Sequence, residues 1–272
     1  MNVRLIATDL DGTMLSSKKT VSERTRETFR RAREQGCVYT LATGRCSTII
    51  PHEQLPECDY MILDNGAEIR DRKTGEVIYA AYMAESDLLA LLDKLCDYPI
   101  AMECFVDGTL LIDEALYKNL IKEQFHMGLF AKGLVTIVPD LRAYLEKGNA
   151  RVTKINLLFR DLSCFGEVGE KLYASSGFEV ANGANTWYEL TREGVSKGVA
   201  LSILCDRLGI DIKDAAAFGD SMNDVSMLKV AGWSVAMGNS TKEAEEAAKY
   251  HTLTNDEDGV AVFIEKELGL ER

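Results

Sequence analysis

The first third of the chain alternates short apolar runs with more polar stretches. The apolar runs predict buried strands, because each is short and followed by a turn signal; they are Val3–Thr8, Cys37–Ala42 and Tyr60–Leu63. Ser22–Gln35 predicts a helix, with Ser22 as its N-cap and Gly36 as its end. This strand–helix–strand–strand order predicts a parallel sheet whose strand ends gather at one edge.

The middle of the chain mixes patterns of both kinds. Glu68–Tyr82 alternates around Lys73-Thr74-Gly75, which predicts a hairpin, and Ser86–Leu95 carries leucines at helical spacing. Further on we expect strands over Ala101–Phe105, Leu110–Ile112 and Thr153–Phe159, and helices around Leu116–Phe125, Leu141–Glu146 and Glu167–Ser175. This mixture predicts a small α+β domain over residues 83–188.

The first pattern returns at Glu189. The elements expected there are a helix over Ser196–Leu208, a strand over Ala215–Phe218, a helix to about Val230, a strand over Trp233–Met237, a helix that follows the capping-box spacing Ser240-Thr241-Lys242-Glu243, and a helix over Val260–Leu268. The predicted fold class is α/β. A Rossmann-like, mostly parallel sheet core formed by residues 1–82 and 189–272 receives an inserted α+β cap domain over residues 83–188.

Composition narrows the range of partners. The 272 residues are 46% hydrophobic and 27% charged, a balance that is ordinary for globular proteins. The net charge of −12 offers no basic field to a nucleic acid or an anionic membrane, and no apolar run is long enough to span a membrane. Seven scattered cysteines without a CxxC pair, and no signal-peptide pattern, predict a cytoplasmic protein with reduced thiols. The oligomeric state is left open.

The first predicted strand ends in Asp9-Leu10-Asp11-Gly12-Thr13. Two carboxylates this close repel each other unless a cation or a shared proton relieves them. A carboxylate can attack phosphorus and form an aspartyl-phosphate, provided that a cation such as Mg²⁺ masks its charge. The second carboxyl can protonate the leaving alcohol and then deprotonate the attacking water. The alternative for an isolated pair is a solvated, Asp-rich turn.

Three later segments lie at the ends of predicted elements. Thr43-Gly44-Arg45 follows the second strand, where a hydroxyl and exposed amides could clamp a phosphate, although a plain turn would look the same. Lys197 begins a helix, where a cation is unfavourable unless an anion binds there or the side chain is solvated. Asp220 and Asp224 follow a strand with Asn223 between them, and the acids could complete a magnesium site with Asp9. The alternative is N-capping by Asp220 or Asn223.

Asp-Leu-Asp-Gly-Thr, Thr-Gly-Arg, Ser-Lys-Gly and Gly-Asp-Ser-Met-Asn-Asp, in this order, resemble the four motifs of the haloacid dehalogenase superfamily. The insertion of roughly one hundred residues before Ser196 is similar in position and size to the cap of the Cof-like phosphatases, subclass IIB. The closing run Thr254-Asn255-Asp256-Glu257-Asp258-Gly259-Val260-Ala261 also resembles that branch.

The resemblance implies a role for each matching residue. Asp9 would be the nucleophile and a Mg²⁺ ligand, and Asp11 the acid and base, with its carbonyl on the metal. Asp220 would be the third protein ligand, and Asp224 would support the site from behind the ligands. The phosphoryl group would be held by the Leu10 amide, Thr43, Gly44, Lys197 and Asn223, with Arg45 either contacting the substrate or structural.

The function expected from this resemblance is Mg²⁺-dependent hydrolysis of small phosphorylated metabolites, above all sugar phosphates. The cap would choose the substrate, and Asn182–Trp187 is a candidate segment, although Trp187 also suits the core at the domain junction. One alternative is a phosphomutase, which would need basic cap residues such as Lys118, Lys122, Lys132, Arg142 and Arg151. A non-catalytic phosphate-ligand binder would be expected to lack Asp9 or Asp11, and a purely structural module would leave all four segments unexplained.

Overall fold

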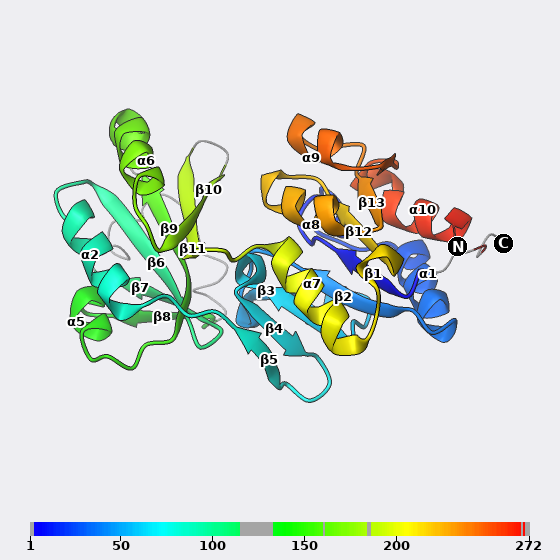
Figure 1. The fold of residues 1–272 in the computed structure, drawn as a ribbon, viewed down its shortest axis with the longest axis horizontal. Helices are drawn as coiled ribbons and strands as arrows, with labels where there is room; N and C mark the ends of the chain where they lie inside the picture. The colour runs from blue at the N-terminus through cyan, green and yellow to red at the C-terminus, as the bar shows by residue number, and fades with distance from the viewer. Residues whose placement is uncertain (1–2, 115–132, 160, 184–185, 268, 270–272) are drawn as a thin grey trace. The chain divides into compact units, whose positions relative to one another are not determined.

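The computed structural model describes residues 3–114, 133–159, 161–183, 186–267 and 269. The chain forms two compact units, which are described separately below. The core unit comprises Met1–Gly44, Pro51–Tyr79 and Ser196–Arg272, and the cap unit comprises Arg45–Ile50 and Ala80–Val195. Each unit is built around its own sheet (Figure 1).

The core unit contains a sheet of eight strands in the order β14-β13-β12-β1-β2-β3-β4-β5. The strands are β1 (Leu5–Thr8), β2 (Val38–Ala42), β3 (Tyr60–Leu63), β4 (Glu68–Asp71), β5 (Val77–Ala80), β12 (Ala215–Gly219), β13 (Trp233–Ala236) and β14 (Tyr250–His251). All neighbours from β14 to β3 are parallel, and β4 is antiparallel to β3. The mostly parallel sheet is therefore confirmed.

Helices cover both faces of this sheet (Figure 1). They are α1 (Glu23–Glu34), α7 (Lys197–Leu208), α8 (Val225–Val230), α9 (Lys242–Ala247) and α10 (Gly259–Glu267). On one face Leu201 and Leu204 of α7 pack against Ala7 and Ala217 of the central strands. On the other, Phe29 of α1 lies against Tyr39, and Phe263 of α10 against Phe218. Coverage of both faces explains why the central strands are apolar throughout.

Serine side chains cap two helices of the core unit. As predicted, Ser22 caps α1 by accepting a hydrogen bond from the N–H of Thr25. Ser196, which was expected to be the first residue of its helix, caps α7 by accepting from the N–H of Val199. The capping box predicted at Ser240 is wrong, because Thr241 is the N-cap of α9 and accepts from the N–H of Ala244. The short 3₁₀ helices of the core are His52–Gln54, Asp64–Gly66, Ile212–Asp214, Met222–Asp224 and Asn255–Glu257.

The cap unit contains a six-stranded sheet in the order β10-β11-β9-β6-β7-β8. Its strands are β6 (Ile100–Val106), β7 (Thr109–Asp113), β8 (Val135–Val138), β9 (Val152–Phe159), β10 (Phe178–Gly183) and β11 (Trp187–Arg192), and its helices are α2 (Glu85–Leu95), α5 (Leu141–Leu145) and α6 (Phe165–Tyr173), with 3₁₀ turns at Ser47–Ile49 and Leu162–Cys164. One sheet face packs on these helices through Leu88, Leu145, Ile155 and Leu172. All pairs are antiparallel except β7–β8.

The cap departs most from the sequence-based expectations. Three strands, β8, β10 and β11, were not expected, and β11 runs to Arg192, past the boundary predicted at Glu189. The strand continues because Thr191 and Arg192 pair with Glu179 and Phe178 of β10. Asn182–Trp187 includes the end of β10 and the first residue of β11, and its residues 184–185 lie outside the described residues. The predicted helix at Leu116–Phe125 also lies outside the described residues, as do Lys118, Lys122 and Lys132.

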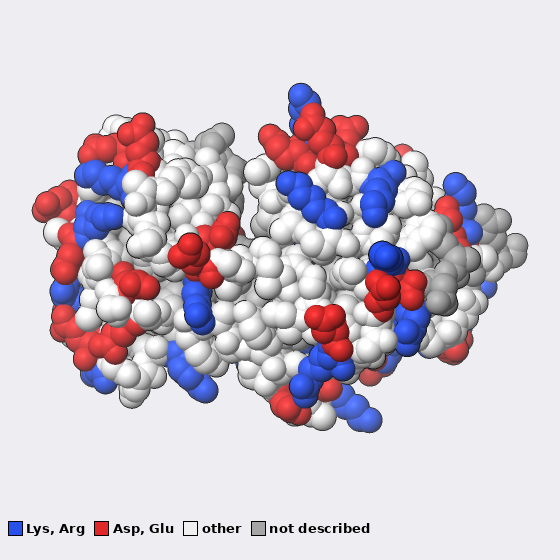
Figure 2. All heavy atoms as spheres, viewed as in Figure 1, with Lys and Arg blue, Asp and Glu red and all other residues white. Residues whose placement is uncertain are grey.

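The surface shows no concentration of positive charge on the face in view. In Figure 2, basic side chains are scattered among acidic ones, and acidic side chains gather over α9, whose sequence is KEAEEA. Among the described residues, no helix combines the length and the apolarity that crossing a membrane requires.

Candidate active site

The predicted site residues of the core unit follow the carboxyl ends of neighbouring parallel strands. Asp9 comes directly after β1, Thr43 after β2 and Asp220 after β12. Because β1 pairs in parallel with both β2 and β12, these ends meet at one edge of the sheet. That edge is where open α/β sheets bind their ligands.

Lys197 joins two of the carboxylates in the interior. Its Nζ lies 2.6 Å from Oδ1 of Asp9 and 2.7 Å from Oδ1 of Asp224. Lys197 and Asp224 are fully buried, and Asp9 is 5% exposed. A cation in the first turn of a helix is unfavourable by itself, and here two carboxylates offset that cost. The alternative of a solvated surface lysine is therefore wrong.

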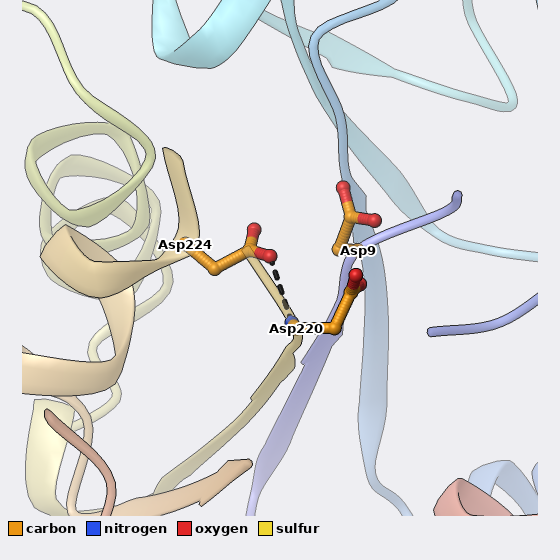
Figure 3. A group of neighbouring side chains, drawn as sticks. All are labelled: Asp9, Asp220 and Asp224. Carbon is orange, nitrogen blue, oxygen red and sulfur yellow. Dashed lines mark hydrogen bonds between the residues drawn. The ribbon is translucent and has the colours of Figure 1, made fainter. Parts of the chain in front are cut away.

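Asp224 is held from several sides by donors of the protein. Its Oδ2 accepts the backbone N–H of Asp220 and of Ser221, both at 3.0 Å, while Oδ1 accepts from Lys197. Figure 3 shows the first of these bonds as a dashed line. Ser221, rather than Asp220 or Asn223, is the N-cap of the 3₁₀ helix, so the N-cap alternatives for those two residues are wrong. Asp224 thus fixes both Lys197 and the loop of Asp220.

Asp220 is positioned from the loop after β1. Its Oδ1 accepts a hydrogen bond of 2.7 Å from the hydroxyl of Thr13. Gly12 has φ of +88°, and a Cβ at this position would lie 2.5 Å from Oδ2 of Asp220. Only glycine lets the backbone adopt this conformation so close to the carboxylate. Figure 3 shows the Asp9 and Asp220 carboxylates beside each other, with that of Asp224 to their left.

The excess negative charge of this cluster favours the binding of a cation. Burial, and then the charge of Asp224, raise the pKa of Asp220 to about 6. Burial also raises the pKa of Asp9, where the attraction of Lys197 is countered by Asp224 and Asp220. Burial alone would lower the pKa of Lys197, but Asp224 and Asp9 hold it above its ordinary value. Three carboxylates around one lysine leave excess negative charge in a poorly solvated place.

Two of the three carboxylates suit a divalent cation. One oxygen of each of Asp9, Asp220 and Asp224 lies within 4.8 Å of the others. Both oxygens of Asp224 already accept hydrogen bonds from Lys197 and from backbone amides, which leaves it a supporting role. Oxygen ligands supplied by carboxylates are those that Mg²⁺ prefers. Asp9 and Asp220 therefore fit as ligands of a hard cation.

Asp11 lies outside the buried cluster. Its side chain is 38% exposed, and its Oδ1 lies 2.9 Å from Nζ of Lys19. Between the two acids, Leu10 is buried and its carbonyl accepts the N–H of Leu15. The loop thus directs Asp9 inward and Asp11 toward the surface. This division suits one carboxyl that stays fixed and one that exchanges protons with solvent or substrate.

The remaining predicted residues surround the cluster to different degrees. Thr43 is buried, and Asn223, directly before Asp224, donates from Nδ2 to Oδ1 of Asn65 at 3.0 Å. Arg45 belongs to the segment Arg45–Ile50 of the cap unit and donates from Nη1 to the carbonyl of Ile49 at 3.1 Å.

Three residues that bear on the site were not singled out from the sequence. Thr13 and Ser221 bond to Asp220 and Asp224, and Asn65 bonds to Asn223. Asn65 had a local signal, because an Asn-Gly pair after a strand predicts a left-handed turn. Thr13 and Ser221 lie inside segments already recognised, but their bonds depend on how separate strands align.

Comparison with known proteins fits this geometry. The sequence model of the haloacid dehalogenase-like hydrolases matches residues 6–264. The chain belongs to this family. The resemblance drawn from its four segments is thereby confirmed, and the chain is an enzyme of the hydrolase class.

Relatives matching almost the whole chain are phosphatases. A 5-amino-6-(5-phospho-D-ribitylamino)uracil phosphatase of Bacillus subtilis is 30% identical, with 98% of each chain covered. A pyridoxal phosphate phosphatase of Escherichia coli is 31% identical, covering 98% of this chain and all of the relative (100%). The solved structure of a subclass IIB sugar phosphatase is 23% identical, with a TM-score of 0.80 over 98% of this chain and 100% of its own, which shows a shared fold.

Proposed function

We propose that this chain is a Mg²⁺-dependent phosphatase of small phosphorylated metabolites, with sugar phosphates as the first class of substrate. The observation that carries the proposal is the buried Asp9–Lys197–Asp224 arrangement with Asp220 beside it. Membership of the hydrolase family and relatives named as phosphatases support the hydrolysis of a phosphoric monoester.

Asp9 is the nucleophile in this proposal. Lys197 binds its Oδ1 and thereby orients the carboxylate for attack. A bond forms between a carboxylate oxygen of Asp9 and phosphorus as the bond from phosphorus to the ester oxygen breaks. Asp11 gives a proton to the departing alcohol, and then takes one from the water that attacks the aspartyl-phosphate. Inorganic phosphate leaves, and both carboxyls return to their starting state.

The surrounding residues bind and neutralise the phosphoryl group. The Leu10 amide, Thr43, Gly44, Lys197 and Asn223 would donate hydrogen bonds to its oxygens. Mg²⁺, held by Asp9, Asp220 and the carbonyl of Asp11, would mask the negative charges that otherwise keep carboxylate and phosphate apart. Asp224 contributes by fixing Lys197 and the Asp220 loop. Arg45 remains a candidate for substrate contact.

The relatives share one reaction, the hydrolysis of a phosphate ester, but they act on different leaving groups. The relatives are named for a ribitylaminouracil phosphate, pyridoxal phosphate and sugar phosphates, three unlike leaving groups joined to one kind of phosphate ester. We assign the choice among them to the cap unit. Two of the basic cap residues that a phosphomutase would need are already paired, Arg142 with Asp93 and Arg151 with Asp107. This pairing favours the phosphatase over the mutase.

The cysteines and the net charge indicate the compartment and the partner of the proposed enzyme. All seven cysteines are free thiols and five of them are buried, which supports a reducing compartment such as the cytoplasm. The expected partner is a small phosphoester rather than a nucleic acid, since the chain carries a charge of −12.

The test measures phosphate release from sugar phosphates, nucleotides and pyridoxal phosphate, with Mg²⁺ and with a chelator, for the wild type and Asp9→Asn. We expect metal-dependent release that falls at least about 1,000-fold in the variant, because the nucleophile is removed. Release that persists in Asp9→Asn would contradict the mechanism. Isomerised sugar in place of free phosphate would identify a mutase.

A further inference from the structure

The turn after β3 is unusual in its backbone. Asp64, Asn65 and Gly66 have φ angles of 51°, 58° and 102°, and all three residues are buried. A left-handed residue other than glycine is strained and persists only where its surroundings fix it. This segment, the Asp64–Gly66 turn, must therefore be held by its neighbours.

Asn65 lies between two segments that the proposed function assigns to the phosphoryl group. Its backbone N–H donates to the carbonyl of Thr43 at 3.1 Å. Its Oδ1 accepts from Nδ2 of Asn223 at 3.0 Å. A Cβ on Gly44 would lie only 2.8 Å from the same Oδ1, so the carboxamide rests directly against that glycine.

Gly66 brings the turn to a third segment. A Cβ at this position would lie 2.3 Å from the carbonyl oxygen of Ser196 and 2.9 Å from the N of Lys197. With φ of +102°, this close approach excludes any side chain. The Asp64–Gly66 turn thus contacts the loop after β2, the loop after β12 and the start of α7.

We propose that Asn65 is a positioning residue for phosphoryl transfer, acting through Asn223 and Gly44. The oxygen of the Asn223 amide accepts from Oγ of Ser221 at 2.7 Å, and one of its two N–H groups goes to Asn65. These two bonds fix the plane of the amide and hence the direction of its second N–H. The assignment rests on the proposed function, in which Asn223 and Gly44 hold the phosphoryl group.

The primary variant is Asn65→Gly. Glycine keeps the left-handed backbone without strain and removes only the carboxamide, so folding is preserved. We expect kcat/KM for a sugar phosphate to fall between about 10-fold and 100-fold, because small displacements of binding groups cost that much in transfer reactions. Inhibition by orthovanadate should weaken in parallel. Unchanged kcat/KM and unchanged vanadate inhibition would overturn the proposal.

A double-variant cycle separates positioning from a general structural role. If Asn65 acts through Asn223, the loss in Asn65→Gly/Asn223→Ala will be smaller than the product of the two single losses. Losses that multiply would show that Asn65 acts independently, against the proposal. The matched control is Asp258→Gly, which removes the side chain of another left-handed residue, one bonded to Thr25, and should leave kcat/KM within about 2-fold.

Asp9→Asn, measured in the same assay, separates a failure of the proposed function from a failure of the role given to Asn65. If Asp9→Asn retains turnover, the proposed function fails whatever Asn65 does. If Asp9→Asn is inactive and Asn65→Gly is as active as the wild type, only the role of Asn65 fails.

Discussion

Both units bury charged side chains, but they place them in different ways. In the core unit Asp9 and Asp224 follow strand ends and Lys197 begins a helix, and the three touch one another. In the cap unit Glu103 and Lys154 lie within β6 and β9, on the sheet face that alternates with the one packed against the helices. The first arrangement concentrates charge at a point, and the second spreads it over a surface.

The cap face is organised by strand register. Glu103 lies opposite Asn156, and Asn156 opposite Glu189, so that three polar side chains form a row across β6, β9 and β11. Nδ2 of Asn156 donates to Glu103 at 2.9 Å, and Lys154 lies 3.4 Å from Glu189 and 4.4 Å from the centre of the Phe105 ring. We therefore expect substitutions in this row to act one residue at a time, and the loss of any member of the core cluster to disturb the others. In the proposed function, the core cluster carries the chemistry and the cap unit selects the leaving group.

Among substitutions that test this contrast between the two units, we expect the largest effect at Lys197. In Lys197→Met we expect turnover to fall at least about 1,000-fold, because Asp9 loses its anchor and the phosphoryl group a donor. The free energy of unfolding should also fall by about 3–5 kcal/mol, since two buried carboxylates lose their cation. Steady-state kinetics and urea unfolding measure the two effects. An active Lys197→Met enzyme would contradict the role given to this cluster.

We expect an intermediate effect of pH and of Mg²⁺ on the stability of the folded protein. Because the folded pKa of Asp220 is raised to about 6, and that of Asp9 is raised as well, the folded state without metal favours their protonated forms. That stability is present below about pH 4 and is lost as the pH rises through the folded values, about 3 kcal/mol for Asp220. Acids with lowered pKa, such as Asp71 and Asp161, finish titrating below this window.

The melting temperature in chelator should therefore fall between pH 5 and pH 8, and Mg²⁺ should raise it more at pH 8 than at pH 5. Calorimetry of the wild type beside Asp220→Asn measures this directly. The variant should lose the part of the slope that falls between pH 5 and pH 7. A wild-type melting temperature that rises over this range would show that Asp220 and Asp9 are not buried as described.

The smallest effect is expected at the other buried lysine. Lys154→Met keeps the length of the side chain and its packing on Phe105 and leaves Glu189, which is 18% exposed, in contact with water. Turnover of a small generic ester such as p-nitrophenyl phosphate should change by less than roughly 3-fold. A loss comparable with that of Lys197→Met would end the distinction between the two units. Unequal changes among natural phosphoesters would sharpen it.

The sequence predicted the core far better than the cap, for a physical reason. The strands β1, β2, β3 and β12 are apolar and almost wholly buried, and each is followed by a turn, so they were found within one or two residues. In the cap, β8 is only four residues long with two of them exposed, and β11 mixes apolar and polar residues, so local pattern did not distinguish these strands from loops. Their pairing with β7, β9 and β10 stabilises them instead.

The sequence by itself determined the family and the candidate site residues, because these residues come in short segments whose order and spacing are local properties. Asp9 with Asp11, and Asp220 with Asp224, were visible as carboxylates after strands. Only the tertiary structure decided that Lys197 is buried between Asp9 and Asp224, that Asp11 faces the surface, and that Asn65 bonds to a residue 158 positions away. Such contacts depend on the parallel register of strands far apart in the chain, and no local pattern records that register.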